Sequence, residues 1–458
     1  MVDNIESRHN RIGNRKKLVI TIAGIVVVIV ALAGLYILDV QKQTLVITRT
    51  SDKAPPIPQD IGVQLDDKNP IKVGVLHSLS GTMAISETSV VDATLLAIEE
   101  INDRGGVLGR KIEPIIRDGR SDWPTFAKEA ERLITEDDVS AVFGGWTSAS
   151  RKTMKPIFEK YNHLLFYPVQ YEGLEQSPNI VYTGAAPNQQ VLPAVDWAFE
   201  NLGTKFFLVG SDYVFPRSAN EIMKHRITEL GGEILGEEYR ILGDDDFVEI
   251  ANKIIETQPD VILNTINGDS NVAFFKELRE RGIKPQSIPT ISFSIAEDEI
   301  RHLGAENMKG DYAAWNYFQN LDTPSNKVFV TNFKNKFGAH RVTDDPMEAA
   351  YIGVYLFAQA VENVGKDDVN AVREAVKGLT FSAPEGIVGV DPENQHLSKV
   401  VRIGRILETG QFEIVASSEE PIKPIPYPKY KSKEEWQAFL DNLYYGWGEQ
   451  WSKPVLDT

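Results

Sequence analysis

A short segment, GGWTSASRK at Gly144–Lys152, brings together residue types that often carry chemistry in proteins. It follows an apolar run, Val139–Phe143, that predicts a strand, and it leads into a segment with helical periodicity. Hydroxyl groups, an aromatic ring and two cations at such a junction fit three kinds of site. These are a catalytic serine, a phosphate-binding loop and a polar cup for a small neutral molecule.

The catalytic and phosphate-binding alternatives lack support elsewhere in the chain. Ser148 and Ser150 have no histidine within ten residues, and no G-x-S-x-G elbow occurs. The sequence contains neither G-x-x-x-x-G-K-[ST] nor G-x-G-x-x-G, the motifs that hold phosphates on backbone N–H groups. We therefore predict no catalytic residue, and we favour a binding function over an enzymatic one.

Metal and nucleic-acid sites are also disfavoured. The chain has no cysteine, and none of its 7 histidines pairs with another at helix or hairpin spacing, so we predict no metal site and no cofactor. The run Asp244–Asp246 lacks the glycine turn and distal glutamate of a calcium loop, and it is better explained as a solvated helix start. The formal net charge of −17 argues against nucleic acid as a partner.

Five further segments place polar and aromatic residues where a predicted strand passes into a helix. They are His77–Glu87, Phe166–Gly173, Gly210–Arg217, Asn264–Asn271 and Ser292–Glu299. Each segment alone could serve only as a helix cap, for which serine and aspartate are good residue types. Ligands in open α/β sheets bind at the carboxyl ends of the strands, so the segments together predict an aromatic-walled site between two lobes.

Two series of alternating strand and helix patterns must position these segments. The first begins near Ile71 and the second near Thr204, with a break at Tyr182–Gln190 that predicts a crossover between two lobes. Alternation of this kind predicts parallel sheets covered by helices on both faces. The helical segment Asp345–Gly365 is expected to return to the first lobe.

The N-terminal region predicts a membrane anchor. The segment Leu18–Leu38 carries no charge and is long enough to cross a bilayer. Basic residues outnumber acidic ones ahead of it, so the positive-inside rule leaves the short tail in the cytoplasm. The motif Ala31–Ala33 would also fit a signal-peptide cleavage site, but the apolar run continues past it, which favours a retained helix. The proline-rich, polar segment Ser51–Pro70 predicts an extended tether.

Several of these motifs together resemble the urea and short-chain amide branch of the type I periplasmic binding proteins. The motifs are GVLHSLSGTMAISE, GGWTSASRK, FYPVQYEG, YTGAAPNQQ, SDYVFPR, TINGDSNV, AAWNYFQ and DPMEAAYIG, spread over residues 68–425. The pair Val169-Gln170, NGDSN and DPMEAAYIG favour the substrate-binding components of urea ABC transporters. The segment EEPIKPIPY instead favours the related amide-sensing regulators of amidase operons, so urea is preferred while a short-chain amide stays open.

The resemblance implies two doubly wound parallel-sheet α/β lobes, joined by a three-crossover hinge and able to close over a ligand. With the anchor included, the expected division is a cytoplasmic tail at 1–17, a transmembrane helix at 18–38, a tether at 39–67, lobe 1 at 68–187 plus 316–378, lobe 2 at 188–315 plus 379–425, and a C-terminal strap at 426–458.

The resemblance also implies a set of ligand-binding residues. Lobe 1 is expected to contribute Trp146, Thr147, Ser148, Tyr167 and Gln170, and lobe 2 is expected to contribute Tyr213, Phe215, Asn267, Asp269 and Ser294. Ser148 and helix-start N–H groups could donate to a urea carbonyl, while Asp269 and Gln170 could accept from its amino groups. Related regulators often have tyrosine at the position of Phe215, which puts a hydroxyl contact there in doubt. Arg151 and Lys152 are expected to face solvent or to tie the lobes together.

These inferences converge on a single-pass protein of the cell membrane with its binding body on the extracytoplasmic side. We expect it to capture urea, or a short-chain amide, and to deliver this ligand to the permease subunits of an ABC transporter. The alternative is a membrane-tethered sensor that reports urea or amide levels to a partner protein. An amide-hydrolysing enzyme is disfavoured because the chain lacks cysteine, paired metal ligands and a serine–histidine motif.

Overall fold

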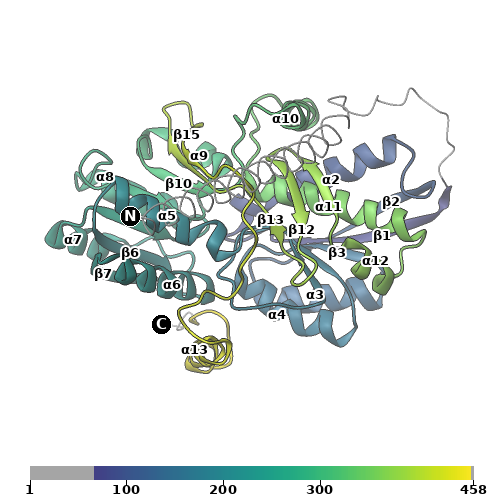
Figure 1. Cartoon of the computed structure of the whole chain (residues 1–458), viewed down its shortest axis with the longest axis horizontal. Coiled ribbons are helices and arrows are strands. Elements are labelled where there is room, and N and C mark those ends of the chain that lie inside the picture. Colours follow the sequence, from purple (N-terminus) through teal and green to yellow (C-terminus); the bar gives the residue numbers. More distant parts are fainter. Residues whose placement is uncertain (1–65, 455–458) are drawn as a thin grey trace, which may run out of the picture. The chain divides into compact units, whose positions relative to one another are not determined.

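The computed structural model of the chain describes residues 66–454 (Figure 1), which lie within one compact unit, Gly62–Thr458. The predicted transmembrane helix at Leu18–Leu38 and nearly all of the predicted tether lie outside the described residues. Between residues 66 and 454, no helix combines the length and the apolar character that crossing a membrane requires.

The first sheet is parallel throughout and has the strand order β2-β1-β3-β4-β5. Its strands are β1 (Asp66–His77), β2 (Arg110–Asp118), β3 (Ala141–Gly144), β4 (Leu165–Tyr167) and β5 (Ile180–Tyr182). The order reverses between β1 and β3, where Leu76 lies opposite Gly144. Such a switch point leaves a crevice at the carboxyl ends of the two strands, where ligands bind in open α/β sheets.

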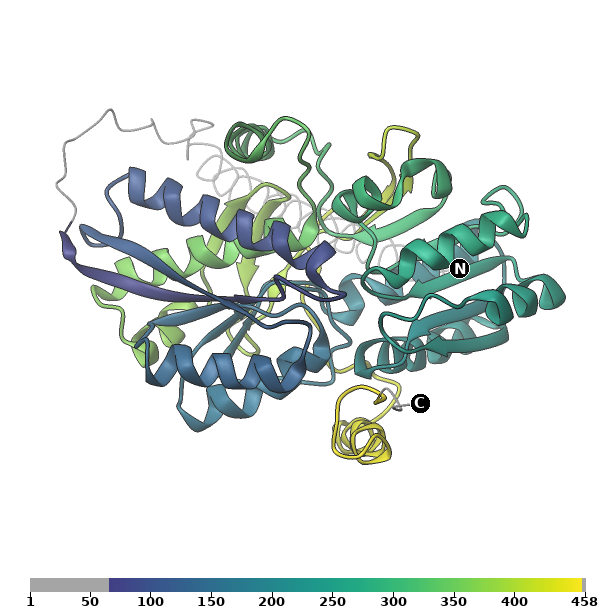
Figure 2. The ribbon, with the colours of Figure 1, turned by 180° about the vertical axis from the view of Figure 1, so that it is seen from behind.

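Helices cover both faces of the first sheet (Figures 1 and 2). One face is covered by α2 (Ala84–Asp103) and α11 (Asp345–Val364). The other face is covered by α3 (Trp123–Thr135) and α4 (Ser148–Lys160). Two more helices flank the first pair: α12 (Val369–Val376) packs against α11, and α10 (Pro324–Phe337) packs beside α2. The expected return of Asp345–Gly365 to the first sheet is confirmed, because Ile352 and Val354 of α11 share a buried cluster with the strands. We call the elements on this sheet the first lobe.

The second sheet has the order β15-β14-β10-β9-β8-β6-β7. Its strands are β6 (Lys205–Ser211), β7 (Glu233–Arg240), β8 (Val261–Thr265), β9 (Thr290–Ser292), β10 (Tyr312–Trp315), β14 (Arg402–Ile406) and β15 (Phe412–Ser417). Neighbours from β7 to β10 are parallel, whereas β14 and β15 add an antiparallel edge that the sequence analysis did not foresee.

Side chains of the second sheet alternate between two cores, as a strand with period two requires. Phe206 and Leu208 of β6 pack in one cluster, and Phe207 and Val209 pack in the other. The first cluster is covered by α5 (Val191–Asn201) and α6 (Val214–Leu230). The second cluster is covered by α7 (Val248–Thr257), α8 (Ser270–Glu280) and α9 (Glu297–Leu303). Two short 3-10 helices are η1 (Pro187–Gln189) and η2 (Ala305–Asn307). These elements form the second lobe.

A small antiparallel sheet follows α12 and bears on the expected lobe boundaries. It consists of β11 (Thr380–Ala383), β12 (Gly386–Val390) and β13 (Leu397–Ser398). Ala383, Val388 and Leu397 lie in the buried cluster of the first lobe, although residue 379 onward was assigned to lobe 2. The division into lobes stays a prediction, and we propose that lobe 1 extends to about residue 399, where the small sheet ends.

The chain passes between the two lobes at three places, after β5, after β10 and after β13. Asn316, which follows β10, joins all three crossings through its side-chain amide. Its Nδ2 donates to Gln189 O at 3.1 Å in the first crossing and to Val400 O at 2.9 Å in the third. Gln189 Nε2 in turn donates to Leu397 O at 2.8 Å, so the hinge is one hydrogen-bonded bundle.

The C-terminal segment ends in α13 (Lys433–Gly446), which packs against the second lobe. Trp436 is fully buried there together with Leu440, and its Nε1 donates to Pro428 O at 3.0 Å. The strap therefore adds side chains to the core of the second lobe.

Replacing Trp436 with alanine tests the contribution of the strap. We expect Trp436→Ala to lower the free energy of unfolding by about 3–5 kcal/mol, because a large buried ring leaves a cavity and its hydrogen bond is lost. Unfolding in guanidinium chloride, followed by tryptophan fluorescence and circular dichroism, measures this change. Tyr445→Ala is the matched control, since Tyr445 lies on the same helix and is 66% exposed. Equal stability of the two variants would contradict a structural role for the strap.

Candidate ligand site

The corner between β3 and α4 is shaped by two glycines and a helix cap. A Cβ atom on Gly144 would lie 2.0 Å from Leu76 O, so only glycine lets β3 pass this close to β1. Thr147 is the N-cap of α4, and its side chain accepts a hydrogen bond from Ser150 N at 3.0 Å. The capping role considered for Ser148 thus belongs to Thr147, and Ser148 is the first helical residue.

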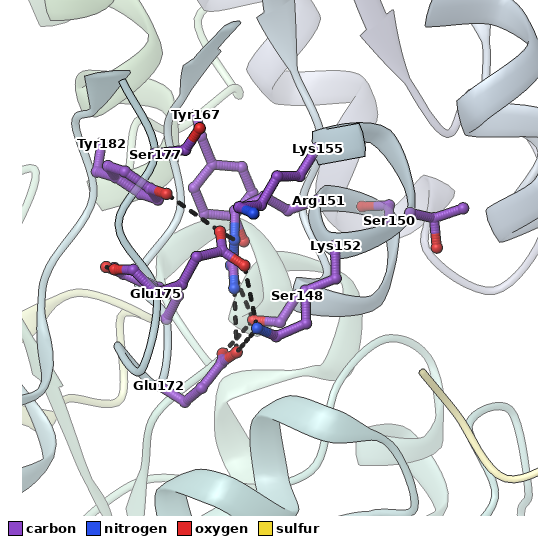
Figure 3. A network of polar contacts seen from close by, with 12 residues as sticks. Ser148, Ser150, Arg151, Lys152, Lys155, Tyr167, Glu172, Glu175, Ser177 and Tyr182 are labelled. Atoms are coloured by element: carbon purple, nitrogen blue, oxygen red, sulfur yellow. Dashed lines mark hydrogen bonds and ion pairs between the residues drawn. The ribbon is translucent and has the colours of Figure 1, made fainter. Parts of the chain in front are cut away.

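Arg151 occupies the centre of a buried polar cluster beneath this corner (Figure 3). Its guanidinium donates to Glu172 Oε1 at 3.0 Å, to Glu175 Oε1 at 2.9 Å and to Ser148 Oγ at 3.0 Å. Lys152 Nζ donates to Glu175 Oε2 at 3.0 Å, and Ser148 donates to Glu172. Of the two expected positions for Arg151 and Lys152, facing solvent is wrong because both are buried, and their ion-pair partners Glu172 and Glu175 lie in the same lobe.

The charges of this Arg151 cluster balance, with two cations and two carboxylates. Burial alone would lower the pKa of Arg151, but Glu175 and Glu172 raise it well above its usual value. Burial would likewise raise the pKa of Glu175, but Arg151 and Lys152 lower it well below the usual range. Arg151 and Glu175 are therefore held in their charged forms by their partners in the cluster.

Aromatic rings enclose the cluster on the side of the first lobe. The Arg151 guanidinium lies 4.9 Å from the ring centroid of Tyr167 and 4.4 Å from that of Tyr171. Tyr167 donates its hydroxyl hydrogen to the backbone carbonyl of Trp146, which holds the main chain at the corner. Burial, the first cause, raises the pKa of Tyr167 above its usual value, so this hydroxyl stays a donor at neutral pH.

Several predicted site residues meet across the two lobes. Trp146 Nε1 lies 3.4 Å from Asn267 Oδ1, which follows β8. Gln170 Nε2 donates to Phe293 O at 2.7 Å and contacts Ser294 Oγ at 3.2 Å, both after β9. The carboxyl ends of strands from both sheets therefore converge on one place, as the strand-end segments predicted.

Tyr213, the N-cap residue of α6, joins this group from the second lobe. Burial is the main cause that raises the pKa of its phenol, and the next causes are Tyr167 and Glu172 of the first lobe. The Tyr213 ring packs in one buried cluster with Ala149, the neighbour of Ser148 on α4. Phe215 packs beside Tyr213, with ring centroids 6.3 Å apart, in the apolar cluster of the second lobe, where it offers an apolar wall.

Asp269 contacts the first lobe from the loop between β8 and α8. Asp269 is exposed to solvent, and its carboxylate accepts a hydrogen bond from Thr82 Oγ1 of the first lobe. It links the lobes at a solvent-exposed position, and its expected role as an acceptor for ligand N–H groups stays a prediction.

Other buried groups near the corner were not assigned by sequence reasoning. His77 and Ser78 at the end of β1 both bond to Glu87 in α2. Glu172 and Glu175 supply the carboxylates of the Arg151 cluster. One sequence signal could have identified Glu87 as a candidate. The segment His77–Glu87 is a polar strand end beside the switch point, and it places an acidic residue in the first turn of the following helix.

A pocket of about 570 Å³ opens beside the candidate site. It is lined by Thr82, Trp123, Lys152 and Asp212 together with C-terminal residues 449–454, and by none of the predicted site residues. Trp123 Nε1 of the first lobe donates to Ser452 Oγ at 2.9 Å, while Val214 N of the second lobe donates to Trp451 O at 2.9 Å. The end of the strap therefore joins both lobes at this pocket.

Buried carboxyl groups also meet where α9 of the second lobe contacts α2 of the first. Ser89 of α2 donates to Asp298 of α9, and Asp344 lies close enough to the α9 carboxylates for their charges to raise its pKa after burial, the main cause. Burial raises the pKa of Glu297 to about 8 and the pKa of Glu299 to about 7, and neighbouring carboxylates add to both shifts. In this contact Glu297 and Glu299 therefore keep their protons up to a higher pH than ordinary glutamates do.

A scan against known families matches residues 71–433 with the model described as "Periplasmic binding protein domain". The Leu/Ile/Val-binding protein homolog 6 of Brucella melitensis is 25% identical over 348 residues, which cover 73% of this chain and 87% of that protein.

Solved structures share the arrangement of the two lobes. One is the solute binding protein of an ABC transporter from Rhodopseudomonas palustris BisB5 in complex with 3,4-dihydroxybenzoic acid, with a TM-score of 0.70 at 24% identity over 77% of this chain and 98% of that one. Another is the branched-chain amino acid transporter substrate binding protein of Streptococcus pneumoniae in complex with isoleucine, with a TM-score of 0.68 at 22% identity over 78% of this chain and 100% of that one. The predicted α/β fold with parallel sheets is confirmed.

Breaking the Arg151 cluster should be costly. We expect Arg151→Met to lower the free energy of unfolding by about 3–5 kcal/mol, because two carboxylates would stay buried without their main partner. Guanidinium chloride unfolding provides the measurement. Lys155→Met, which removes a half-exposed pair with Glu159 on the same helix, should cost less than about 1 kcal/mol. A loss in Arg151→Met no larger than in this control would show that the cluster is not structurally important.

The carboxyl groups of α9 predict a pH dependence of stability. Their folded-state pKa values lie above those of an unfolded chain, so stability is fullest at low pH and falls as the pH rises through the folded values. We expect the melting temperature to drop by roughly 2–4 °C between about pH 6.5 and about pH 8.5. Glu297→Gln and Glu299→Gln should each flatten this slope, whereas the exposed Glu306→Gln should leave it unchanged. A pH-independent melting temperature in the parent protein would refute the assignment.

Proposed function

The chain belongs to the periplasmic binding protein family, whose domain model matches residues 71–433, and on this premise we propose that it captures urea or a short-chain amide between its lobes. We propose further that it delivers this ligand to the permease of an ABC transporter, as the similar solute-binding proteins belong to such transporters. Membership of a binding-protein family favours binding over catalysis, in agreement with the sequence analysis.

The observation that carries the choice of ligand is the internal balance of the Arg151 cluster. Arg151 and Lys152 are the cations next to the converging strand ends, and Glu172 and Glu175 already pair with both of them. A ligand carboxylate entering here would have to compete with these buried pairs, at a high desolvation cost. A neutral, planar ligand would not have to compete with these ion pairs for Arg151 or Lys152.

The remaining groups of the site suit a urea or amide function. Hydroxyl and indole donors near Trp146 and Tyr213 can bond a carbonyl oxygen, and the flat rings can stack on the ligand plane while excluding water. We propose that Trp146, Thr147, Ser148, Tyr167, Gln170, Tyr213, Phe215, Asn267 and Ser294 form this site, with Asp269 holding the lobes together from its exposed position. So small a ligand gains affinity mainly by satisfying every polar group.

We also propose that the uncharged segment Leu18–Leu38 anchors the protein in the cell membrane, with the lobes on the extracytoplasmic side. The proposal rests on the length of the segment and on the basic residues ahead of it. A tether between this anchor and residue 66 would let the lobes reach a neighbouring permease.

A calorimetric panel tests the proposed ligand class. Full-length protein, purified in detergent, is titrated with urea, acetamide, formamide, isoleucine and 3,4-dihydroxybenzoate. We expect urea or an amide to bind at least about tenfold more tightly than the two carboxylates, a difference of about 1.4 kcal/mol. Tight binding of isoleucine or the benzoate, with no heat from urea or the amides, would overturn the proposal.

A further inference from the structure

Glu87 is a fully buried carboxylate at the start of α2 that the Arg151 cluster does not engage. Its Oε2 accepts two hydrogen bonds, from Ser78 N at 2.8 Å and from His77 Nδ1 at 3.0 Å. Its Oε1 is equally inaccessible to solvent and has no hydrogen-bond partner among residues 66–454. One half of the carboxylate is therefore fixed and the other half lacks a donor.

The position of Glu87 connects it to the candidate site. His77 and Ser78 close β1, and β1 lies beside β3 at the switch point, so Glu87 approaches the corner that carries Trp146. The negative charge of Glu87 is also among the causes that raise the pKa of Tyr213, after burial and nearer groups. The start of α2, which carries Glu87, also meets the second lobe directly, since a Cβ atom on Gly268 would lie 2.9 Å from Thr82 O and 3.2 Å from Met83 Sδ.

The chemistry of this pair specifies what a partner must bring. A carboxylate oxygen such as Glu87 Oε1 accepts hydrogen bonds, so a partner at this position must bring a donor. His77 Nε2 also lacks a partner among the described residues. Buried polar atoms without partners cost free energy, and each one in a native protein requires an explanation, of which a bound ligand is one.

We propose that Glu87 is the specificity-determining residue of the site and that its Oε1 accepts a hydrogen bond from an N–H group of the bound ligand. The ligand class is then a neutral molecule with an NH₂ group attached to a carbonyl carbon. His77 and Ser78 act as positioning residues, because they hold Oε2 and so aim Oε1. A ligand carboxylate is disfavoured at this point because it brings acceptors, and no donor, to Oε1.

This inference rests on the proposed function, and an isosteric ligand pair separates the two. Acetamide and acetone share their shape and carbonyl group, but acetone has a methyl group in place of NH₂. Calorimetry with the full-length protein in detergent measures urea, acetamide, acetone and acetate. The parent protein should bind acetamide at least about tenfold more tightly than acetone, because acetone cannot donate a hydrogen bond to Glu87 Oε1.

The variant Glu87→Gln tests the residue itself. We expect it to weaken urea and acetamide binding by about tenfold to a hundredfold and to leave acetone binding unchanged. The ratio by which urea and acetamide bind more tightly than acetate should become smaller. Glu100→Gln is the matched control, since Glu100 lies on the same helix and accepts from the hydroxyls of Tyr351 and Tyr355, away from the site. The control should bind all four ligands as the parent protein does.

Each outcome decides one of the two proposals. If the parent protein binds urea or acetamide and Glu87→Gln binds them equally well, the role of Glu87 is refuted while the proposed function stands. If the parent protein binds neither molecule, both proposals fail. If Glu87→Gln does not fold, as judged by circular dichroism, the acetamide and acetone affinities of the parent protein decide, and equal affinities refute the role of Glu87.

Discussion

The burial of one ionised guanidinium, that of Arg151, constrains the structure around the candidate site. A charge out of contact with water is tolerated only with close partners, so Glu172 and Glu175 must both lie beneath α4. This requirement folds the segment after β4 back against the helix. Gln170 lies on that segment, and its amide reaches Phe293 O and Ser294 Oγ of the second lobe. A charge cluster inside one lobe thereby helps to set the contact with the other.

A second set of buried hydrogen bonds, at the hinge, also helps to set how the two lobes meet. The amide of Asn316 ties the first and third crossings to the second, and its backbone N–H donates to Asp345 Oδ2 at 2.9 Å at the start of α11. Three chain crossings that share hydrogen bonds are held at fixed positions relative to one another, as a hinge between two lobes requires. Strand ends in different sheets can then return to the same positions around a ligand.

The sequence predicted those features that depend on local pattern. The alternation in KFFLVGS placed Phe206 and Leu208 on one face of β6, and the strand-end segments converge as parallel sheets require. It did not predict the burial of Arg151, because adjacent cations on a helix are normally solvated and the partner carboxylates lie more than twenty residues away. The exposed position of Asp269 was missed for a related reason, since only the fold decides which side of a strand-end loop faces the other lobe.

Ligand choice in this fold must come from side chains at the strand ends and not from the architecture. Solved proteins with isoleucine and with a dihydroxybenzoate share the arrangement at TM-scores of 0.68 and 0.70. Direct bonds such as Trp146 with Asn267 and Thr82 with Asp269 already join the lobes here. A ligand therefore need not supply much contact area to hold the lobes together. It has to satisfy the polar atoms that the protein leaves without partners, and among these Glu87 Oε1 demands a donor, which a molecule as small as urea provides.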